Sequence, residues 1–437
     1  MLSLLLLFAC GDSDTDADTD TGAAHTDGGT STDGGSGTGD GGTDGDGGTG
    51  DGGTGDGGST APEPSCADLA DVDLRVPEDH ATLAEAVAAA ADGSTICLAP
   101  GTWSEQISLY ERQLRIVGAG APGDTVLDGS GTGRVLKLRD SSLELQGLTI
   151  RGGVAELGGG IYASDSQLLL TDVELSDNRA QPDDPGKTGL VSLGGGAIYS
   201  TGGRVELVEV GFFDNAMDCG SVAECGGVGG ALYVGGDATL WGVQILDTQV
   251  RTFTGSYGSA AKLADGAVEV DHLTIAGTGH EGAGYAWAVL SLYRTSSARV
   301  HQADIVGNRI AVDQVYAGAL SVVNTSLDLQ GSHLAFNELI GSESSQGEAI
   351  ALDWVQSPVL AWNNIHDNGP SPFAGMDDPI GSDGNIDADP LFVDRTASSA
   401  RSWDLRLDPA SPSKDAGDPA LLDTDGSRRD IGAFGGR

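Results

Sequence analysis

The sequence has few basic residues. Its 437 residues include 22 Lys and Arg against 65 Asp and Glu, which gives a formal net charge of -43 at pH 7. A chain this acidic repels a phosphate backbone, so nucleic acid is not an expected partner. Aromatic residues are also scarce, at 5% of the chain, whereas there are 70 glycines. This composition favours a body with many turns over one thick globular core.

The apolar run at the start of the chain is too short to span a bilayer. Residues 1–10 read MLSLLLLFAC, whereas a membrane-spanning helix needs about 20 residues. Leu7-Phe8-Ala9-Cys10 resembles the lipobox of bacterial lipoproteins, which implies that Cys10 becomes the lipidated first residue of the mature chain. Gly11 after the cysteine implies sorting to the outer membrane. The other interpretation is a secretory signal whose cysteine is incidental.

Residues 11–65 lack both basic side chains and apolar residues that could pack. They consist mainly of Asp, Gly and Thr, as in the repeated GDGGT units. We expect this segment to be a disordered, solvated tether that binds cations only loosely. The alternating Asp residues resemble the start of an EF-hand loop, but the flanking helices and the closing Glu are missing.

Cysteine is rare, and its five positions favour an exported protein. With Cys10 assigned to lipid, four cysteines remain. Their proximity in the sequence predicts the disulfides Cys66–Cys97 and Cys219–Cys225, which require an oxidising compartment. A metal site is the alternative for the second pair, but its spacing is not C-x2-C and no His lies nearby.

One phrase recurs along the chain. Residues 193–216 read as a glycine cluster, a short strand, a turn, a second strand with period-two alternation, and an Asn. Taking that Asn as the anchor, the equivalent positions are Asn178, Asn215, Thr248, Thr278, Asn308, Asn337 and Asn368. Their spacings of 37, 33, 30, 30, 29 and 31 residues are typical of stacked repeats.

The aligned repeats share apolar positions. Three residues before the anchors stand Leu175, Phe212, Ile245, Ile275, Ile305, Leu334 and Ile365. Eight residues before them stand Leu170, Leu207, Leu240, Val270, Val300, Leu329 and Leu360. Stacking the repeats at about 4.8 Å would bury these columns in one continuous core. The pattern predicts an all-β right-handed parallel β-helix of roughly eight to ten coils.

Residues 66–106 are expected to form an amino-terminal cap and the first strand. Thr82 and Glu85 form a T-x-x-E capping box, and an apolar face follows it up to Asp92-Gly93. An amphipathic helix here would cover the open end of the stack. The stretch from Arg75 to Ile107 resembles the cap of secreted bacterial β-helix proteins of the pectin-lyase-like superfamily.

Residues 107–368 contain the repeats. GGGIY, GGGAIY and GGALY, together with FFDN, resemble the repeats of polymorphic outer-membrane proteins and related adhesins. Coil lengths differ mainly between each anchor and the next glycine cluster, so we expect insertions that project from one edge and form a binding surface.

Residues 369–437 diverge from the repeat and resemble the closing segment of secreted bacterial β-helix proteins, so we interpret them as a carboxy-terminal cap. Asp423, Asp425 and Asp430 surround Gly426. Their oxygens could hold Ca2+, or the stretch could be an Asp/Gly turn that bonds to its own backbone. No other cofactor is indicated.

The resemblance to the pectin-lyase-like superfamily raises the question of catalysis. Gly279-His280-Glu281-Gly282 matches only half of the G-H-G motif of polygalacturonases, and their R-I-K motif is absent. His280 is either a ligand-binding or acid/base residue, or a solvated histidine in a loop.

Tyr162, Tyr199 and Tyr233 follow the inward residue on three successive coils. We expect these rings to face outward and to stack at about 4.8 Å spacing. They could form a platform for sugar rings, or a structural ladder that shields the sheet.

The leading hypothesis is a monomeric lipoprotein anchored in the outer membrane and facing the cell surface. It would be a non-catalytic, adhesin-like module that binds polysaccharide or another cell surface. The alternative is a carbohydrate-active lyase or hydrolase with a non-standard site, because fold alone does not give function.

Overall fold

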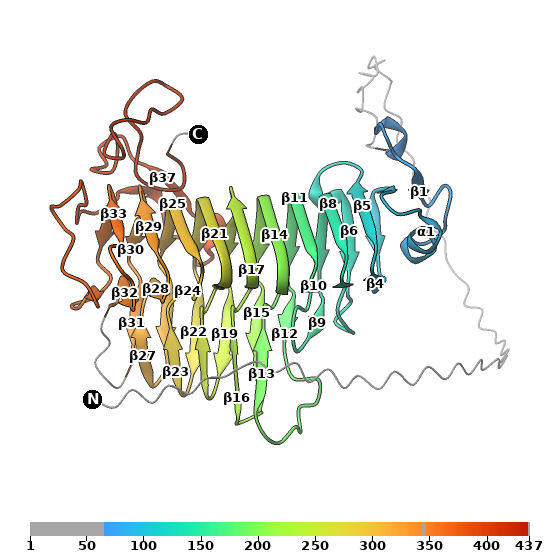
Figure 1. Ribbon diagram of the computed structural model, residues 1–437, viewed down its shortest axis with the longest axis horizontal. Coiled ribbons are helices and arrows are strands. Elements are labelled where there is room, and N and C mark those ends of the chain that lie inside the picture. The colour runs from blue at the N-terminus through green and yellow to red at the C-terminus, as the bar shows by residue number, and fades with distance from the viewer. Residues whose placement is uncertain (1–64, 342–346, 436–437) are drawn as a thin grey trace, which may run out of the picture. The chain divides into compact units, whose positions relative to one another are not determined.

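The computed structural model describes residues 65–341 and 347–435. The predicted leader, Cys10 and almost all of the predicted tether lie outside these residues. The described chain is all-β, with one α-helix and sheets built from parallel strands (Figure 1). Within the described residues no helix has both the length and the apolar character needed to cross a bilayer.

The largest sheet contains strands from every repeat. Its strands are β1 (Leu74–Val76), β2 (Thr95–Leu98), β3 (Gly101–Trp103), β4 (Ile107–Tyr110), β5 (Gln113–Gly118), β6 (Thr125–Asp128), β7 (Leu136–Arg139), β8 (Ser142–Arg151), β10 (Ile161–Ser164), β11 (Gln167–Ser176), β14 (Ile198–Phe213), β17 (Leu232–Trp241), β18 (Gln244–Leu246), β21 (Ala261–Ala276), β24 (Leu290–Tyr293), β25 (Ser297–Val306), β28 (Leu320–Val323), β29 (Leu327–Gln330), β30 (His333–Ala335), β32 (Ile350–Asp353), β33 (Val359–Ala361), β34 (Asn364–His366) and β35 (Phe373–Ala374).

The register of this sheet follows the repeat. Leu170 pairs with Leu207, and Leu175 pairs with Phe212, so equivalent positions of successive repeats are neighbours. The inward side chains merge into one apolar core that continues from Val76 to Ile365. The predicted alignment of the two apolar columns is therefore observed in the strand register.

The anchor asparagines connect the repeats through buried hydrogen bonds. The backbone N–H of Asn178 donates to Oδ1 of Asn215 at 3.0 Å, and Nδ2 of Asn215 donates to the Leu175 carbonyl at 2.8 Å. The left-handed backbone lies one residue earlier, as at Asp177 and Asp214, which both have φ 55°. The Asn therefore acts through its amide side chain and not through its own backbone conformation.

The predicted insertions are largely strands. The segments between the anchors and the following glycine clusters contribute the strands of a seven-stranded sheet and of a five-stranded sheet, both parallel (Figure 1). The seven strands are β9 (Val154–Ala155), β12 (Arg179–Ala180), β15 (Ala216–Asp218), β19 (Gln249–Thr252), β22 (Gly279–Gly282), β26 (Arg309–Ala311) and β31 (Glu338–Ile340). The five strands are β13 (Val191–Gly194), β16 (Cys225–Val228), β20 (Gly255–Tyr257), β23 (Tyr285–Trp287) and β27 (Gln314–Ala317). Parts of the expected insertions are therefore paired strands and not projecting loops, whereas residues 181–190 and 219–224 lie outside strands.

Helix α1 (Leu83–Ala89) is the one α-helix of the described residues. The Thr82 hydroxyl accepts the N–H of Glu85 at 3.1 Å, as the capping box predicts. The helix ends at Ala89, earlier than the predicted stop at Asp92-Gly93. Its buried residues join the core of the strands, because Leu83 lies in the same apolar cluster as Ile96.

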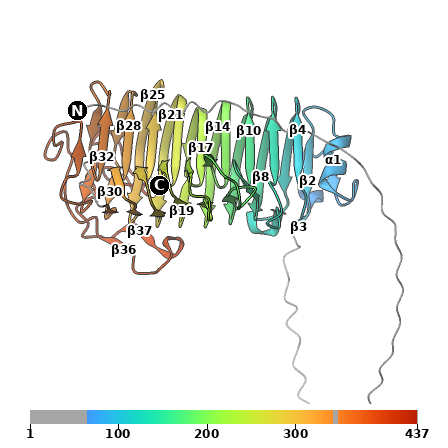
Figure 2. The same cartoon turned by 90° about the horizontal axis from the view of Figure 1, so that it is seen from below.

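The segment after the last repeat packs along the flank of the stack. Its two strands, β36 (Phe392–Asp394) and β37 (Asp404–Leu407), form an antiparallel pair (Figure 2). Residues from this segment contact outward side chains of the repeats at Phe213, Leu246, Ala276, Val306 and Ala335. The Arg401 guanidinium reaches back to Glu174 at 3.3 Å. Much of the predicted carboxy-terminal cap is therefore a lateral cover over several repeats.

Short 3-10 helices complete the described elements. They span Cys66–Asp68, Pro122–Asp124 and Ala400–Ser402.

Candidate functional site

The predicted tyrosine stack exists but is covered. Tyr162, Tyr199 and Tyr233 pair in register on β10, β14 and β17. The ring centroids lie 5.9 Å and 4.6 Å apart, with the planes tilted by 8° and 19°. Tyr162 is 9% exposed and Tyr199 is 4% exposed.

Cations approach the outer faces of this stack. The Arg134 guanidinium lies 4.8 Å from the Tyr162 centroid, and Lys262 Nζ lies 6.0 Å from the Tyr233 centroid. The three tyrosine rings of the stack also contact one another, so little of their surface remains for a ligand. This arrangement favours the structural ladder over a sugar platform at these three positions.

A second group of aromatic side chains lies on the five-stranded sheet, and we call it the aromatic cluster. Its members are Tyr257, Tyr285, Trp287 and Tyr316. The residues that alternate with them, such as Ser256 and Ala286, are fully buried, so the rings point outward. Tyr316 is 45% exposed and the other three rings are partly exposed.

Three rings of the aromatic cluster stand in a row and one lies across them. Tyr257 stacks on Trp287 at 6.1 Å and 19°, and Trp287 stacks on Tyr316 at 5.0 Å and 28°. Tyr285 is turned by 75° from Tyr257, and its hydroxyl donates to the Tyr257 hydroxyl oxygen at 3.4 Å.

Gly255 makes room for the crosswise ring. A Cβ at position 255 would lie 2.6 Å from the Tyr285 ring, so a larger residue there would displace the ring. None of the aromatic rings within the described ranges lies parallel to Tyr285. Tyr285 instead packs against Gly255 and makes T-shaped contacts with Tyr257 at 5.7 Å and with Tyr316 at 6.1 Å.

Lys262 links the aromatic cluster to the buried stack. Its Nζ lies 4.8 Å from the Tyr257 centroid and 4.9 Å from the Tyr293 centroid, within the range of cation–π attraction. Burial raises the pKa of Tyr257 well above its usual value. The Tyr257 hydroxyl is therefore neutral at physiological pH and remains able to donate a hydrogen bond.

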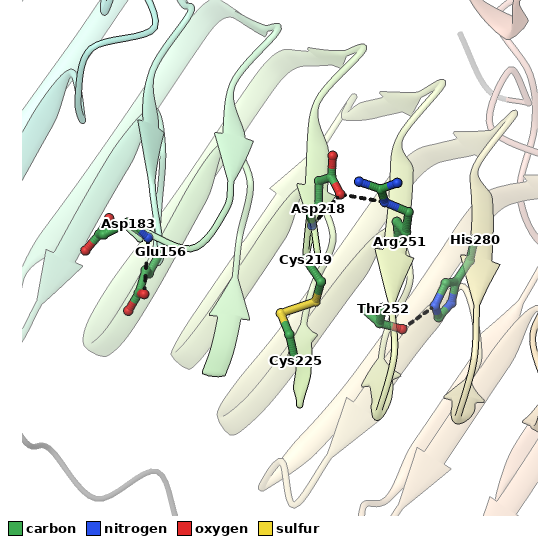
Figure 3. The surroundings of a disulfide bond; sticks show 9 residues. Glu156, Asp183, Asp218, Cys219, Cys225, Arg251, Thr252 and His280 are labelled. Atoms are coloured by element: carbon green, nitrogen blue, oxygen red, sulfur yellow. Dashed lines mark hydrogen bonds and ion pairs between the residues drawn. A yellow bond between two sulfur atoms is a disulfide. The ribbon is translucent and has the colours of Figure 1, made fainter. Parts of the chain in front are cut away.

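His280 lies in the interior, and the prediction of a solvated loop histidine is wrong. It belongs to β22 and is fully buried. Its two ring nitrogens lie 2.9 Å from the Thr252 and Ser259 hydroxyls, and Figure 3 shows the ring turned toward Thr252. Burial lowers the pKa of His280 to about 3. A neutral, enclosed imidazole cannot reach a surface ligand in this structure.

The repeat pattern already indicated that His280 is buried. Val250 pairs with His280, and His280 pairs with Ile310, so the histidine occupies an inward column. The spacing between these residues equals that of the anchors, which makes position 280 part of the repeat and not of a free loop.

Both predicted disulfides are confirmed. Cys66 bonds to Cys97, and Cys219 bonds to Cys225 (Figure 3). The second bond closes a short loop between β15 and β16, beside the ion pair of Asp218 and Arg251 at 2.8 Å. These cysteines are therefore not available as metal ligands.

The predicted calcium ligands bond to backbone groups. Asp425 accepts the N–H of Ser427 at 2.9 Å, and Asp423 accepts the N–H of Asp430 at 3.0 Å. Asp430 accepts the N–H of Asp415 at 2.7 Å. No group of three His, Cys, Asp or Glu side chains in the described part of the chain is arranged to hold a metal ion. The contacts favour the Asp/Gly turn.

No protein-family model matches this sequence, and a search of curated proteins found no match.

The aromatic cluster was missed by the sequence reasoning. Tyr257, Trp287 and Tyr316 are separated by 30 and 29 residues, which is the interval of the repeat. Aligning the segments after the anchors would have placed Tyr257 and Trp287 at one position and Tyr316 one residue earlier in its repeat.

Proposed function

We propose that this chain is an exported parallel β-helix protein whose aromatic cluster binds polysaccharide without catalysis. The β-helix would be right-handed, with roughly eight to ten coils, and α1 would close its first end. The in-register pairing of successive repeats and the shared apolar core support this architecture.

The location we propose is the outer face of the outer membrane. Lipidation at Cys10 would anchor the chain, and residues 11–65 would hold the body away from the surface. The two disulfides support this proposal, since such bonds persist in oxidising compartments.

The partly exposed aromatic cluster is the observation that carries the proposed binding activity. A sugar ring presents a face of C–H groups that packs against an aromatic face, while its hydroxyls seek hydrogen bonds. Tyr316, which is 45% exposed, presents the most open ring of the cluster, and the Tyr285 ring lies 6.1 Å from it. Aromatic anchors of this kind usually dominate the free energy of binding.

A glycan-array screen of the full chain tests this proposal, with bound glycans also assayed for cleavage. The variant Tyr285→Ala/Trp287→Ala should lose binding, by about 1–3 kcal/mol for the pair. Tyr110→Ala/Trp354→Ala is the matched control, because it removes one Tyr and one Trp that are exposed outside the cluster. Equal binding by the cluster variant and the wild-type chain, with intact β structure by circular dichroism, would reject the proposed site.

A further inference from the structure

A second surface feature lies near the amino-terminal end of the described repeats. It is a hollow of about 340 Å3 on the outward side of β5, β8, β11 and β14. That volume is within the range of small-molecule sites. We call this hollow the polar groove.

Two rows of outward side chains line the polar groove, in the register of the strands. One row contains Gln113, Ser142, Gln167 and Arg204. The neighbouring row contains Arg115, Glu144, Leu169 and Glu206. Each row crosses four strands, so equivalent groups recur at about 4.8 Å along the stack.

The charges of the polar groove cancel. Arg115 Nε bonds to Glu144 at 2.8 Å, and Arg204 Nη2 bonds to Glu206 at 3.1 Å. These four side chains are between 36% and 55% exposed, so their pairing contributes little to stability. The groove itself is locally neutral, while the net charge of -43 on the chain opposes the approach of a polyanion.

Leu169 is the apolar exception among these outward positions. It is partly exposed, and it pairs with Glu144 on one side and Glu206 on the other. Leu169 thus adds one apolar side chain to a surface of amides, carboxylates and guanidinium groups. Amide, carboxylate and guanidinium groups are planar, and each can form hydrogen bonds with two adjacent hydroxyls of a sugar ring.

We infer that the polar groove binds a neutral polysaccharide chain that lies along the stack. A pyranose unit is comparable in length to one strand spacing, about 4.8 Å. Successive sugar units could therefore meet successive strands, with C–H groups on Leu169 and hydroxyls on Gln113 and Gln167. The inference shares the ligand class of the proposed function but uses different residues, on other strands than the aromatic cluster.

Calorimetric titration of the full chain tests this inference. The neutral probes are cellohexaose, mannohexaose and xylohexaose, and the anionic probe is hexagalacturonate. Gln113→Ala/Gln167→Ala should weaken binding of a neutral probe at least tenfold, with no change in melting temperature. Gln181→Ala/Gln249→Ala, on residues outside the groove, should bind within twofold of the wild-type chain.

Comparing the groove variant with the aromatic-cluster variant shows which of the two surfaces binds the probe. A neutral probe weakened by the groove variant but not by Tyr285→Ala/Trp287→Ala would support the groove and reject the cluster. The reverse pattern would overturn the inference and leave the proposed function intact. Binding of hexagalacturonate alone, or of no probe at all, would also overturn the inference.

Discussion

At the scale of single residues, the buried imidazole of His280 makes stability depend on pH. Burial lowers its pKa from 6.5 to about 3. In the unfolded chain the imidazole takes up a proton as the pH falls through 6.5, whereas in the folded chain it stays neutral until about pH 3. The unfolded state therefore binds more protons in this window, and the free energy of unfolding falls as the pH falls.

This difference gives a prediction for His280→Gln. Between pH 6.5 and pH 5, the wild-type chain should lose about 1.7 kcal/mol more stability than the variant, because the unfolded imidazole becomes almost fully protonated over this range while the folded one stays neutral. Urea unfolding at the two pH values measures this loss. His80→Gln, a substitution of a partly exposed histidine, is the control and should follow the wild-type chain. An unchanged pH dependence in His280→Gln would show that the imidazole is not held neutral.

The sequence predicted which residues face the core. It did not predict which outward residues are buried under another segment of the chain. Leu175, Phe212 and Ile245 were predicted to be buried because they recur at one position of the repeat, and all three are fully buried. Phe213 and Leu246 follow them and are also buried, because the segment after the repeats packs over them. No local periodicity encodes a contact between such distant parts of the chain.

At the scale of elements, the extra strands were missed because they are short. Gly255–Tyr257 and Tyr285–Trp287 contain three residues each, too few to show an alternation. Their parallel partners stabilise them, since a strand pairs with its counterpart about 30 residues away. The aromatic cluster depends on this pairing, and so it became visible only in the structure.

The flanking segment depends on Trp403. Its ring lies against Gly307, where a Cβ would be 2.7 Å from the ring, and its Nε1 donates to the Ala397 carbonyl at 2.7 Å. Removing the ring would leave a gap between this segment and the repeats.

Trp403→Ala should therefore loosen the segment locally. We expect faster hydrogen exchange in residues 392–407 and a loss of about 2–4 kcal/mol in their local opening free energy. Exchange in β11 should stay close to that of the wild-type chain. Trp354→Ala is the control, because Trp354 is 79% exposed. Wild-type exchange rates in 392–407 of Trp403→Ala would contradict a role for this ring in holding the segment.

At the scale of the whole molecule, the proposed surface location depends on Cys10. Acyl chains hold a protein at a membrane with about 0.8 kcal/mol per buried CH2 group. Cys10→Ser should therefore move the protein from the membrane fraction to the soluble fraction of a bacterial host. Ser13→Ala, a change in the spacer beside the cysteine, should leave it in the membrane fraction.

The disulfides of Cys10→Ser show whether the variant has lost only its membrane anchor or has also failed to be exported. If Cys10→Ser is exported, the disulfides Cys66–Cys97 and Cys219–Cys225 should still form, since they require an oxidising compartment. Mass spectrometry of the wild-type amino terminus should show the lipid, and non-reducing peptide mapping of the variant should show both disulfides. Membrane retention of Cys10→Ser, together with an unmodified wild-type cysteine, would mean that residues 7–10 are not a lipidation signal. Soluble variant protein with reduced cysteines would instead place the defect in export, and the aromatic cluster would then have to be tested without assuming a cell-surface ligand.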